Sequence, residues 1–334
     1  MSMITFTERG LYCAQADVYI DPWKPVKHAL ITHGHADHAR AGSQRYLATH
    51  AAVPVIDYRL KGPQISGIDY GKTVTIHGVK ISFHPAGHII GSAQIRLEYK
   101  GEVWVISGDY KTEYDGISEP YEPVKCHHFV TESTFGLPVF RWQSQKKVIS
   151  EIEEWWTENQ TEGVVSVIHA YALGKAQRII HSLDSIGRIY THGAVENINE
   201  VLRGQGYNLK ETIRVTPDHT YDDFKGSLVI ATSSGIQSEW SKRFKEFSSA
   251  VASGWVAMRG TRRRRAADRG FVLSDHADWT GLMQAIKETE AENIYVTHGY
   301  TDIFSKYLRE QGYNAQVVKT EFSSNEEETE EVQK

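Results

Sequence analysis

Three histidines and one aspartate fall within six residues near the start of the chain, in segment 33–38 (HGHADH). The segment follows a short apolar run typical of a strand, so these side chains leave a rigid element and enter a loop. Imidazole nitrogens and carboxylate oxygens are ligands that Zn²⁺ and similar divalent ions accept. In such a turn, His33 and His35 can converge on one ion while Asp37 and His38 reach a second. We therefore predict a metal site that holds two ions.

Further candidate ligands follow other segments that are expected to be strands, namely His84 and His88, Asp109, and His298. Side chains at strand ends leave a rigid scaffold for a cleft. A single histidine in such a place is usually structural, but together with the first cluster these residues complete two coordination shells.

The elements that must position these residues follow two patterns. Short strand-like segments lie at 19–21, 29–31, 73–76, 79–83, 93–97 and 103–106. Helical spacing of apolar residues at 145–156 then precedes alternating strand-like and helix-like segments at 163–168, 174–183, 188–190 and 227–231. The first pattern suits a two-sheet αββα sandwich, and the second predicts a parallel α/β layer inserted into it. The chain is expected to return to the sandwich through a strand at 270–273, helices at 280–290 and 303–311, and the strand before His298.

Several motifs occur in an order that resembles the metallo-β-lactamase superfamily: HxHxDH after a strand, then Gly-His, Gly-Asp and a late His-Gly. Three segments resemble motifs A, B and C of its β-CASP branch, at 131–136 (TESTFG), 274–278 (SDHAD) and 296–299 (VTHG). Segments 172–177 and 232–238 resemble signatures of the domain inserted in that branch. The resemblance covers roughly residues 5–320. The compact size and segment 259–265 (RGTRRRR) most resemble bacterial DNA-ligase-associated exonucleases.

This resemblance implies an α/β fold in which a metallo-β-lactamase αββα sandwich carries an inserted β-CASP α/β domain. The sandwich is expected at 1–140 and 268–322, and the inserted domain at 141–267. The remaining residues, 323–334, form an acidic tail with five glutamates and one lysine, which is expected to be disordered.

The resemblance also implies the ligand set. One ion is expected on His33, His35 and His88, the other on Asp37, His38 and His298, with Asp109 bridging. His88 is preferred to His84 because the glycine that precedes the family's ligand is matched by Gly87. Asp21 matches the family's first acidic motif and is expected to orient the metal-site loop; an exposed turn aspartate before Pro22 is the alternative.

Catalysis requires a proton for the leaving oxygen, and His276 of motif B is the expected donor. By resemblance, Glu132 of motif A hydrogen-bonds His276 and holds it protonated, since a nearby carboxylate raises the pKa of a histidine. Asp37 completes the expected catalytic set. Plain structural roles are the alternatives: a surface ion pair for Glu132, a packed strand-end residue for His276, and a helix cap for Asp278.

Contacts to nucleic-acid phosphates are expected from two segments. Ser233, Ser234 and Gly235 follow a strand and open a helix, where amides and hydroxyls can hold a phosphate, although an ordinary helix cap explains them nearly as well. The basic segment 259–265 supplies guanidinium groups, whose paired N–H donors suit backbone phosphates. These belong to Arg259, Arg262, Arg263, Arg264 and Arg265. His192, in a segment that echoes motif C, is interpreted as structural.

The composition is that of a packed enzyme, with 40% hydrophobic residues, and 334 residues are enough for two domains or one large layered domain. The formal net charge is −5, but the acidic tail accounts for four of these charges, leaving −1 elsewhere. A polyanionic substrate is therefore compatible with the charge. The two cysteines imply no disulfide framework, and the lack of a signal pattern or a long apolar run makes cytoplasmic location the expectation.

We therefore interpret the chain as a hydrolase that cleaves phosphodiester bonds with two divalent ions, Zn²⁺ or Mn²⁺. DNA cleaved from an end is favoured, in DNA repair, with a DNA ligase and a helicase as partners expected from the resemblance. An RNA-processing nuclease of the same fold is the main alternative, because the active-site residues do not distinguish the two. A non-catalytic scaffold would have lost metal ligands, and a small-molecule hydrolase would not use Glu132, His276 and the inserted domain.

Overall fold

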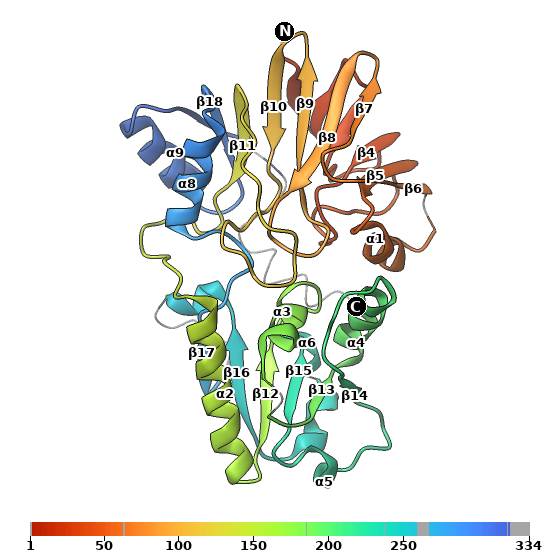
Figure 1. Cartoon of the computed structure of the whole chain (residues 1–334), viewed down its shortest axis with the longest axis vertical. Helices are drawn as coiled ribbons and strands as arrows, with labels where there is room; N and C mark the ends of the chain where they lie inside the picture. Colours follow the sequence, from red (N-terminus) through yellow and green to blue (C-terminus); the bar gives the residue numbers. More distant parts are fainter. Residues whose placement is uncertain are drawn as a thin grey trace. The chain divides into compact units, whose positions relative to one another are not determined.

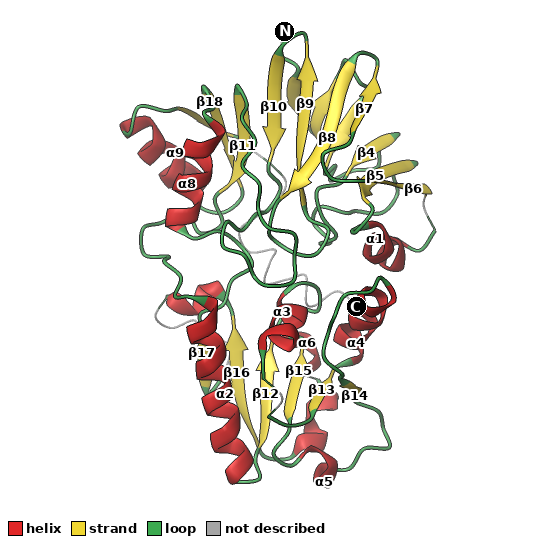
Figure 2. Cartoon of the chain, in the orientation of Figure 1, coloured by secondary structure: helices red, strands yellow, loops and turns green. Residues whose placement is uncertain are grey.

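The computed structural model describes residues 2–62, 64–184, 186–236, 238–258, 267–318 and 320. They form two compact units (Figure 1). Unit 1 contains the described residues up to Arg141 and those from Asp275 onward, and unit 2 contains those from Trp142 to Ser274. Helices and strands occur in both units, so the fold is mixed α/β with several sheets (Figure 2).

The first sheet of unit 1 has six strands in chain order: β1 Ile4–Thr7, β2 Gly10–Cys13, β3 Val18–Ile20, β4 His28–Leu30, β5 Arg45–Thr49 and β6 Gln64–Ile68. The strands β1, β2 and β3 pair antiparallel, and those from β3 to β6 pair parallel. Helix α1 (Val53–Leu60) forms the crossover between β5 and β6. Its Ile56 is fully buried in one cluster with Ala29 and Tyr46, so α1 covers the outer face of this sheet.

The second sheet of unit 1 has seven strands in the order β19 Asn314–Val317, β18 Asn293–Thr297, β11 His128–Glu132, β10 Glu102–Ile106, β9 Ala93–Tyr99, β8 Val79–Pro85 and β7 Thr73–Ile76. One face packs against the first sheet, since Phe83 and Leu97 share a buried cluster with Leu11 and Ile20. Helices α8 (Trp279–Thr289) and α9 (Thr301–Glu310) cover the other face. Unit 1 is therefore a helix–sheet–sheet–helix sandwich.

Unit 2 is built on a parallel sheet in the order β14 Ile213–Arg214, β13 Ile189–Thr191, β15 Leu228–Ala231, β12 Val165–His169, β16 Phe247–Ala252 and β17 Arg269–Phe271. Its helices are α2 Gln145–Thr161, α3 Lys175–Ser182, α4 Gly193–Gly204, α5 Tyr221–Phe224 and α6 Ser233–Ile236, with short 3₁₀ turns η1 Glu239–Phe244 and η2 Gly254–Ala257. Trp156 of α2 is fully buried in a cluster with Ile168 and Ile230, so helix α2 packs on this sheet. Continuous apolar strands of this kind are typical of parallel sheets covered on both faces.

The strand at β17 differs in place from the sequence expectation. The sequence predicts that the strand at 270–273 belongs to the sandwich, and that the inserted domain ends at residue 267. In the structure, Ala250 to Ala252 pair in parallel with β17, so this strand completes the sheet of unit 2. The chain enters unit 1 again after Ser274. A three-residue strand can add to either sheet edge, and its own sequence carries no signal that selects one.

Helix bounds in the structure are close to the expected ones. The expected helix at 145–156 continues to Thr161, and those at 280–290 and 303–311 correspond to α8 and α9. Among the described residues, no helix combines the length and apolar character required to cross a membrane. The acidic tail at 323–334 lies outside the described residues.

Candidate metal centre and proton-donor pair

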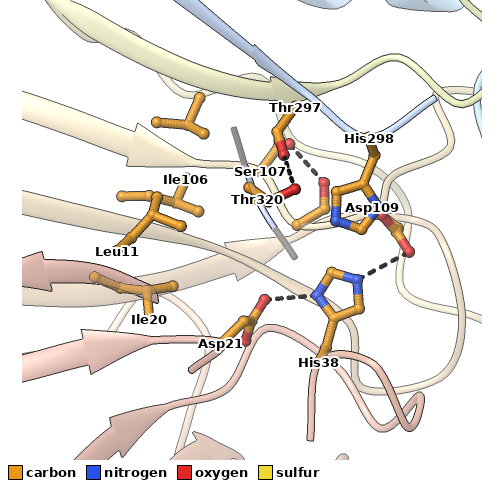
Figure 3. Close-up of a pocket in the computed structure, with 12 residues that line it drawn as sticks. Leu11, Ile20, Asp21, His38, Ile106, Ser107, Asp109, Thr297, His298 and Thr320 are labelled. Atoms are coloured by element: carbon orange, nitrogen blue, oxygen red, sulfur yellow. Dashed lines mark hydrogen bonds and ion pairs between the residues drawn. The ribbon is translucent and has the colours of Figure 1, made fainter. Parts of the chain in front are cut away.

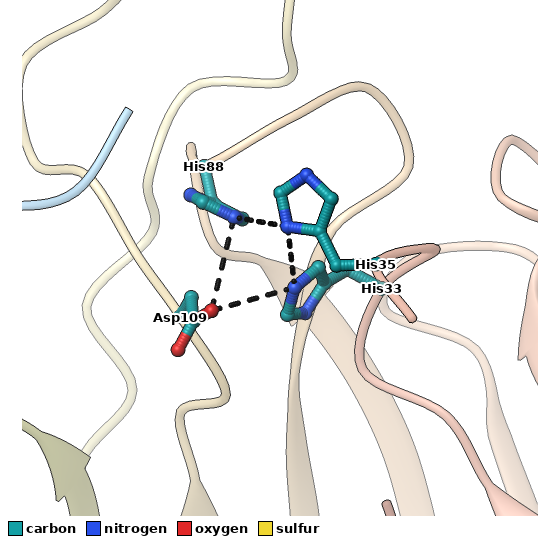
Figure 4. A group of neighbouring side chains, drawn as sticks. All are labelled: His33, His35, His88 and Asp109. Carbon is teal, nitrogen blue, oxygen red and sulfur yellow. Dashed lines mark hydrogen bonds and ion pairs between the residues drawn. The ribbon is translucent and has the colours of Figure 1, made fainter. Parts of the chain in front are cut away.

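Three histidine nitrogens converge beyond the ends of β4 and β8 (Figure 4). The Nδ1 of His35 lies 3.1 Å from the Nε2 of His33 and 3.1 Å from the Nε2 of His88. Two nitrogens that bind one tetrahedral ion at about 2.0–2.1 Å lie about 3.3 Å apart. The spacing of these three ring nitrogens therefore fits a shared ion.

A second group of ligand atoms lies beside the first. The Nε2 of His38 is 3.3 Å from the Oδ2 of Asp37 and 3.3 Å from the Oδ2 of Asp109. The ring of His298 stacks on that of His38 with centroids 5.2 Å apart. These side chains, Asp37 excepted, line one pocket together with Asp21 (Figure 3). The structure thus brings together the residues expected around the second ion.

Asp109 lies between the two groups. Its Oδ2 is 3.5 Å from the Nε2 of His33 and 3.9 Å from that of His88, besides its contact with His38. Its other oxygen, Oδ1, is buried and has no hydrogen-bond partner among the described residues. A buried carboxylate oxygen without a donor is costly unless a cation supplies the missing interaction. Asp109 therefore fits the position of a bridging ligand.

The electrostatics of the cluster favour neutral histidines. Burial lowers the pKa of His33, His88 and His298, so these rings keep a nitrogen lone pair for an ion. His38 behaves differently. Burial alone would lower its pKa, but the carboxylates of Asp37, Asp109 and Asp21 raise it well above the ordinary value.

The two carboxylates beside His38 respond in the opposite sense. Burial alone would raise the pKa of Asp37 and of Asp109, but the charge of protonated His38 outweighs it, and both pKa values are lowered. Both groups are thus held as carboxylates, which is the form that binds a cation. The donor set of neutral imidazoles and buried carboxylates fits two divalent ions such as Zn²⁺ or Mn²⁺.

Two glycines let the ligand-bearing loops approach one another. Gly299 follows His298 with φ +70°, and a Cβ there would overlap the backbone of Ser133 and Thr134. Gly87 precedes His88 with φ +74°, and a Cβ there would overlap the carbonyl oxygen of Lys111. Only glycine meets both conditions, which explains the Gly-His and His-Gly pairs of the sequence.

His276 and Glu132 form a buried pair next to these ligands. The Nδ1 of His276 is 2.9 Å and 3.0 Å from the two oxygens of Glu132. The backbone amides of Tyr110 and Thr134 also donate to Glu132, at 2.9 Å and 3.3 Å. Ligand atoms of Glu132, His276 and Asp109 lie within 4.8 Å of one another. The pair is therefore fixed in orientation at the edge of the metal cluster.

Other predicted residues fall in the supporting roles that the sequence offered. Asp21 is buried and accepts from the Nδ1 of His38 at 2.7 Å, so the exposed-turn alternative is wrong. His84 contacts Ser82 and Glu122 and belongs to none of the metal-binding groups found among the described residues. Asp278 accepts from the amide of Gly281 as the cap of α8, as its structural alternative predicts. His192 likewise caps α4 by accepting from the amide of Ala194.

The residues expected to bind phosphate lie elsewhere in the chain. Ser233, Ser234 and Gly235 belong to unit 2 and open α6, which is four residues long. Arg259 and the run Arg262 to Arg265 lie outside the described residues. The structure therefore leaves the phosphate contacts as sequence predictions.

Sequence reasoning missed two residues that organise the cluster. Thr32 hydrogen-bonds Asp21 and lies beside the ring of His33. Tyr110 donates its amide to Glu132 and accepts from the amide of Ala277 at 2.7 Å. Each is adjacent in sequence to a predicted ligand. However, their roles depend on backbone amides and a single hydroxyl hydrogen bond, which no pattern of residue types reveals.

No family model matches the chain. It is 28% identical to a probable DNA ligase of Opitutus terrae over 92% of this chain and 30% of that protein. It is 22% identical to the endoribonuclease YSH1 of Saccharomyces cerevisiae over 71% of this chain and 38% of that protein. A third relative is cleavage and polyadenylation specificity factor subunit 3-I of Arabidopsis thaliana, at 23% identity over 84% of this chain and 52% of that protein. The chain thus spans only part of the length of these relatives.

A solved structure has a related fold. It is a protein of unknown function from Enterococcus faecalis, with a TM-score of 0.59, 11% identity and coverage of 88% of this chain and 79% of that one. The chain is thus similar to a probable DNA ligase and to proteins named for RNA cleavage, which fits the resemblance to the β-CASP branch of the metallo-β-lactamase superfamily that its motifs indicate.

Proposed function

We propose that this protein is a metal-dependent nuclease that hydrolyses phosphodiester bonds in DNA from an end. In this proposal unit 1 is the metallo-β-lactamase sandwich and unit 2 is the inserted β-CASP domain. The observation that carries the proposal is the position of Asp109 Oδ2, which faces histidines of both expected ligand sets. Relatives named as endoribonucleases support the class of activity.

In the proposed site, His33, His35 and His88 would hold one ion, Asp37, His38 and His298 would hold the other, and Asp109 would bridge them. Two such ions, when bound, would supply a nucleophilic water at neutral pH and neutralise charge on the phosphodiester. The protein's part is to hold these side chains in place before substrate arrives.

His276 is the proposed general acid. Its Nδ1 is bound to Glu132, so the protonated ring presents its second N–H at Nε2, which can be given to the leaving oxygen. Glu132 is oriented by two backbone amides and stays an acceptor toward His276. The carboxylate therefore fixes the ring and stabilises the imidazolium form that donates the proton.

DNA is the proposed substrate. A protein named as a probable DNA ligase matches 92% of this chain at 28% identity, a longer and higher match than those to the yeast endoribonuclease and the Arabidopsis factor named above. The match occupies 30% of that protein, so a segment like this chain occurs within a polypeptide named for ligation. A DNA ligase is therefore a proposed partner, and repair of DNA the proposed context. A helicase partner rests on the family resemblance alone.

RNA processing is the second candidate. It is favoured by relatives named as endoribonucleases, which match 71% of this chain in the yeast protein. The metal ligands and the His276–Glu132 pair would serve either reaction, since both cleave the same type of bond. Only substrate preference distinguishes the two.

The test uses end-labelled single-stranded DNA and RNA of matched sequence, with Zn²⁺ or Mn²⁺. We expect ladders from one DNA terminus, lost in Asp37→Ala and His276→Ala. His50→Ala and Asp69→Ala are matched controls, because this histidine–aspartate pair lies at the surface of unit 1 with side chains 61% and 66% exposed. Internal cleavage of RNA in preference to DNA would select the second candidate. Cleavage of neither substrate by protein that binds metal would overturn the nuclease proposal.

A further inference from the structure

We propose that the hydroxyl of Thr32 and the carboxylate of Asp21 together fix one histidine of each ion's ligand set, so that the two ions are retained or lost together. The inference rests on the proposed two-ion function and adds a positioning role for Thr32. Its basis is a chain of hydrogen bonds that runs from Asp21 to His33 and to His38.

The first branch reaches His33 through Thr32. The Oγ1 of Thr32 is 2.5 Å from the Oδ2 of Asp21 and 3.1 Å from the Nδ1 of His33. A hydroxyl has one hydrogen and a carboxylate only accepts, so the hydrogen of Thr32 goes to Asp21. Thr32 can then only accept from His33, whose Nδ1 must carry the proton. The lone pair of His33 is thereby placed on Nε2, the atom that faces His35 and Asp109.

The second branch reaches His38 directly. Its Nδ1 is 2.7 Å from the same Oδ2 of Asp21, and donation there directs its Nε2 toward Asp37 and Asp109. Thr32 Oγ1 lies farther from this Nδ1, at 3.4 Å. One carboxylate oxygen thus receives both the Thr32 hydroxyl and His38. A disturbance of that oxygen reaches both ligand sets.

Thr32 has no room to rotate away from this arrangement. It is 1% exposed, its amide donates to the Oδ1 of Asp21 at 2.8 Å, and its carbonyl accepts from Ala93 at 2.8 Å. Gly108 lies against its side chain, because a Cβ there would stand 2.6 Å from Oγ1. Thr32 is therefore held by both sheets of unit 1.

His88 provides a contrast within the same ligand set. Its Nδ1 is 2.8 Å from the backbone carbonyl of Asp275, so its orientation does not depend on Thr32 or Asp21. If each ligand were positioned alone, removing the Thr32 hydroxyl would weaken one ion only. Shared support predicts that both weaken, while His88 keeps its place.

The experiment measures metal retention rather than cleavage. Metal-free wild type, Thr32→Val and Thr32→Ser are titrated with Zn²⁺ against a chromophoric chelator, and bound ions are counted by native mass spectrometry. We expect two ions on wild type, a loss of about 10–100-fold in affinity for both ions in Thr32→Val, and affinity within about threefold of wild type in Thr32→Ser. Thr289→Val is the matched control, because Thr289 is equally buried and its hydroxyl bonds Ile286 in α8.

Two further measurements keep the test decisive. Asp21→Asn keeps Thr32 but removes the carboxylate charge and replaces one of the two acceptor oxygens with an NH2 donor, and it should weaken both ions even if Thr32→Val does not fold. Nitrogen-15 spectra of the metal-free protein should show His33 protonated at Nδ1 in wild type, and a shift of that proton in Thr32→Val. Wild-type affinity for both ions in Thr32→Val and Asp21→Asn, or loss of a single ion, would overturn the coupling. A wild type that binds fewer than two ions would overturn the two-ion site itself, and the coupling with it.

Discussion

Two buried carboxylates, one in each unit, show how the same residue type serves chemistry in one place and structure in the other. Asp109 and Glu196 are both 4% exposed. Glu196 receives hydrogen bonds from the hydroxyls of Thr191 and Thr212, at 2.6 Å and 2.5 Å, and a guanidinium N–H of Arg203 at 2.7 Å. One oxygen of Asp109 lies beside imidazole nitrogens. Its other oxygen has no hydrogen-bond donor among the described residues. A buried carboxylate that accepts hydrogen bonds from the protein on both oxygens has a structural role, whereas one with a buried oxygen that accepts none is a candidate metal ligand.

The strand ends of the two units differ in the same way. In unit 2 the residues after the strands close the next turn, as His192 does for α4 and Ser253 for η2. In unit 1 the loops after β4, β8 and β10 instead bring His33, His88 and Asp109 together. Each metal-binding group found among the described residues lies in unit 1. Chemistry is therefore expected to depend on unit 1 side chains far more steeply than on polar residues buried in unit 2.

The largest effect expected from this comparison is that of Asp109→Asn. Removing one negative charge from the position between both histidine sets should reduce metal binding and bring cleavage to background. Glu196→Gln is the matched change in unit 2 and should cost about 2 kcal/mol of stability, with activity per folded molecule within about twofold. Metal counting, thermal unfolding and cleavage rates measure all three quantities. Equal loss of metal in both variants would remove the distinction between the two carboxylates.

The next effect concerns proton donation. His276→Ala should lower the cleavage rate by about 10²–10⁴-fold while two ions remain bound, because a general acid contributes about that much. His192→Ala, which removes a cap in unit 2, should cost about 1 kcal/mol of stability and leave the rate per folded molecule unchanged. Loss of metal in His276→Ala would instead make this histidine a ligand.

The sequence predicted which side chains would meet because residue types that can bind metal stand out in a motif; their role as ligands stays a prediction. The HGHADH segment, Asp109 and His298 converge where the motif order placed them, as does the Glu132–His276 pair. It did not predict Thr32 or Tyr110, whose roles depend on distances to atoms far along the chain. It also named no strand at β16 and no helix at α1. It placed β17 in the wrong sheet, because the pairing of a three-residue strand at a sheet edge is decided by tertiary contacts.

A smaller effect is expected from a pair of glycines. Gly299→Ala should destabilise unit 1 by about 2–5 kcal/mol, because it adds a Cβ at positive φ against the backbone of Ser133. Gly204 ends α4 in unit 2, and nothing lies within 4 Å of a Cβ built there. Gly204→Ala should therefore stabilise the protein by about 0.4–1 kcal/mol. Chemical denaturation of the metal-free protein measures both changes, and a destabilising Gly204→Ala would contradict the contrast.

The last effect expected is the release of a proton when a metal ion binds. His38 has a raised pKa: burial would lower it, but the carboxylates of Asp37, Asp109 and Asp21 outweigh burial. Burial lowers the pKa of His33, His88 and His298. At pH 7 a cation must therefore displace one proton, from His38, because a metal ligand has to be deprotonated. Zn²⁺ affinity should then rise about tenfold per pH unit until the pKa of His38 is passed. Calorimetry in two buffers of different ionisation enthalpy counts this proton. The Glu196 network of unit 2, paired with Arg203 rather than with a histidine, should contribute nothing to the count. Zn²⁺ affinity that does not change between pH 6 and pH 8 would show that His38 is already neutral in the metal-free protein.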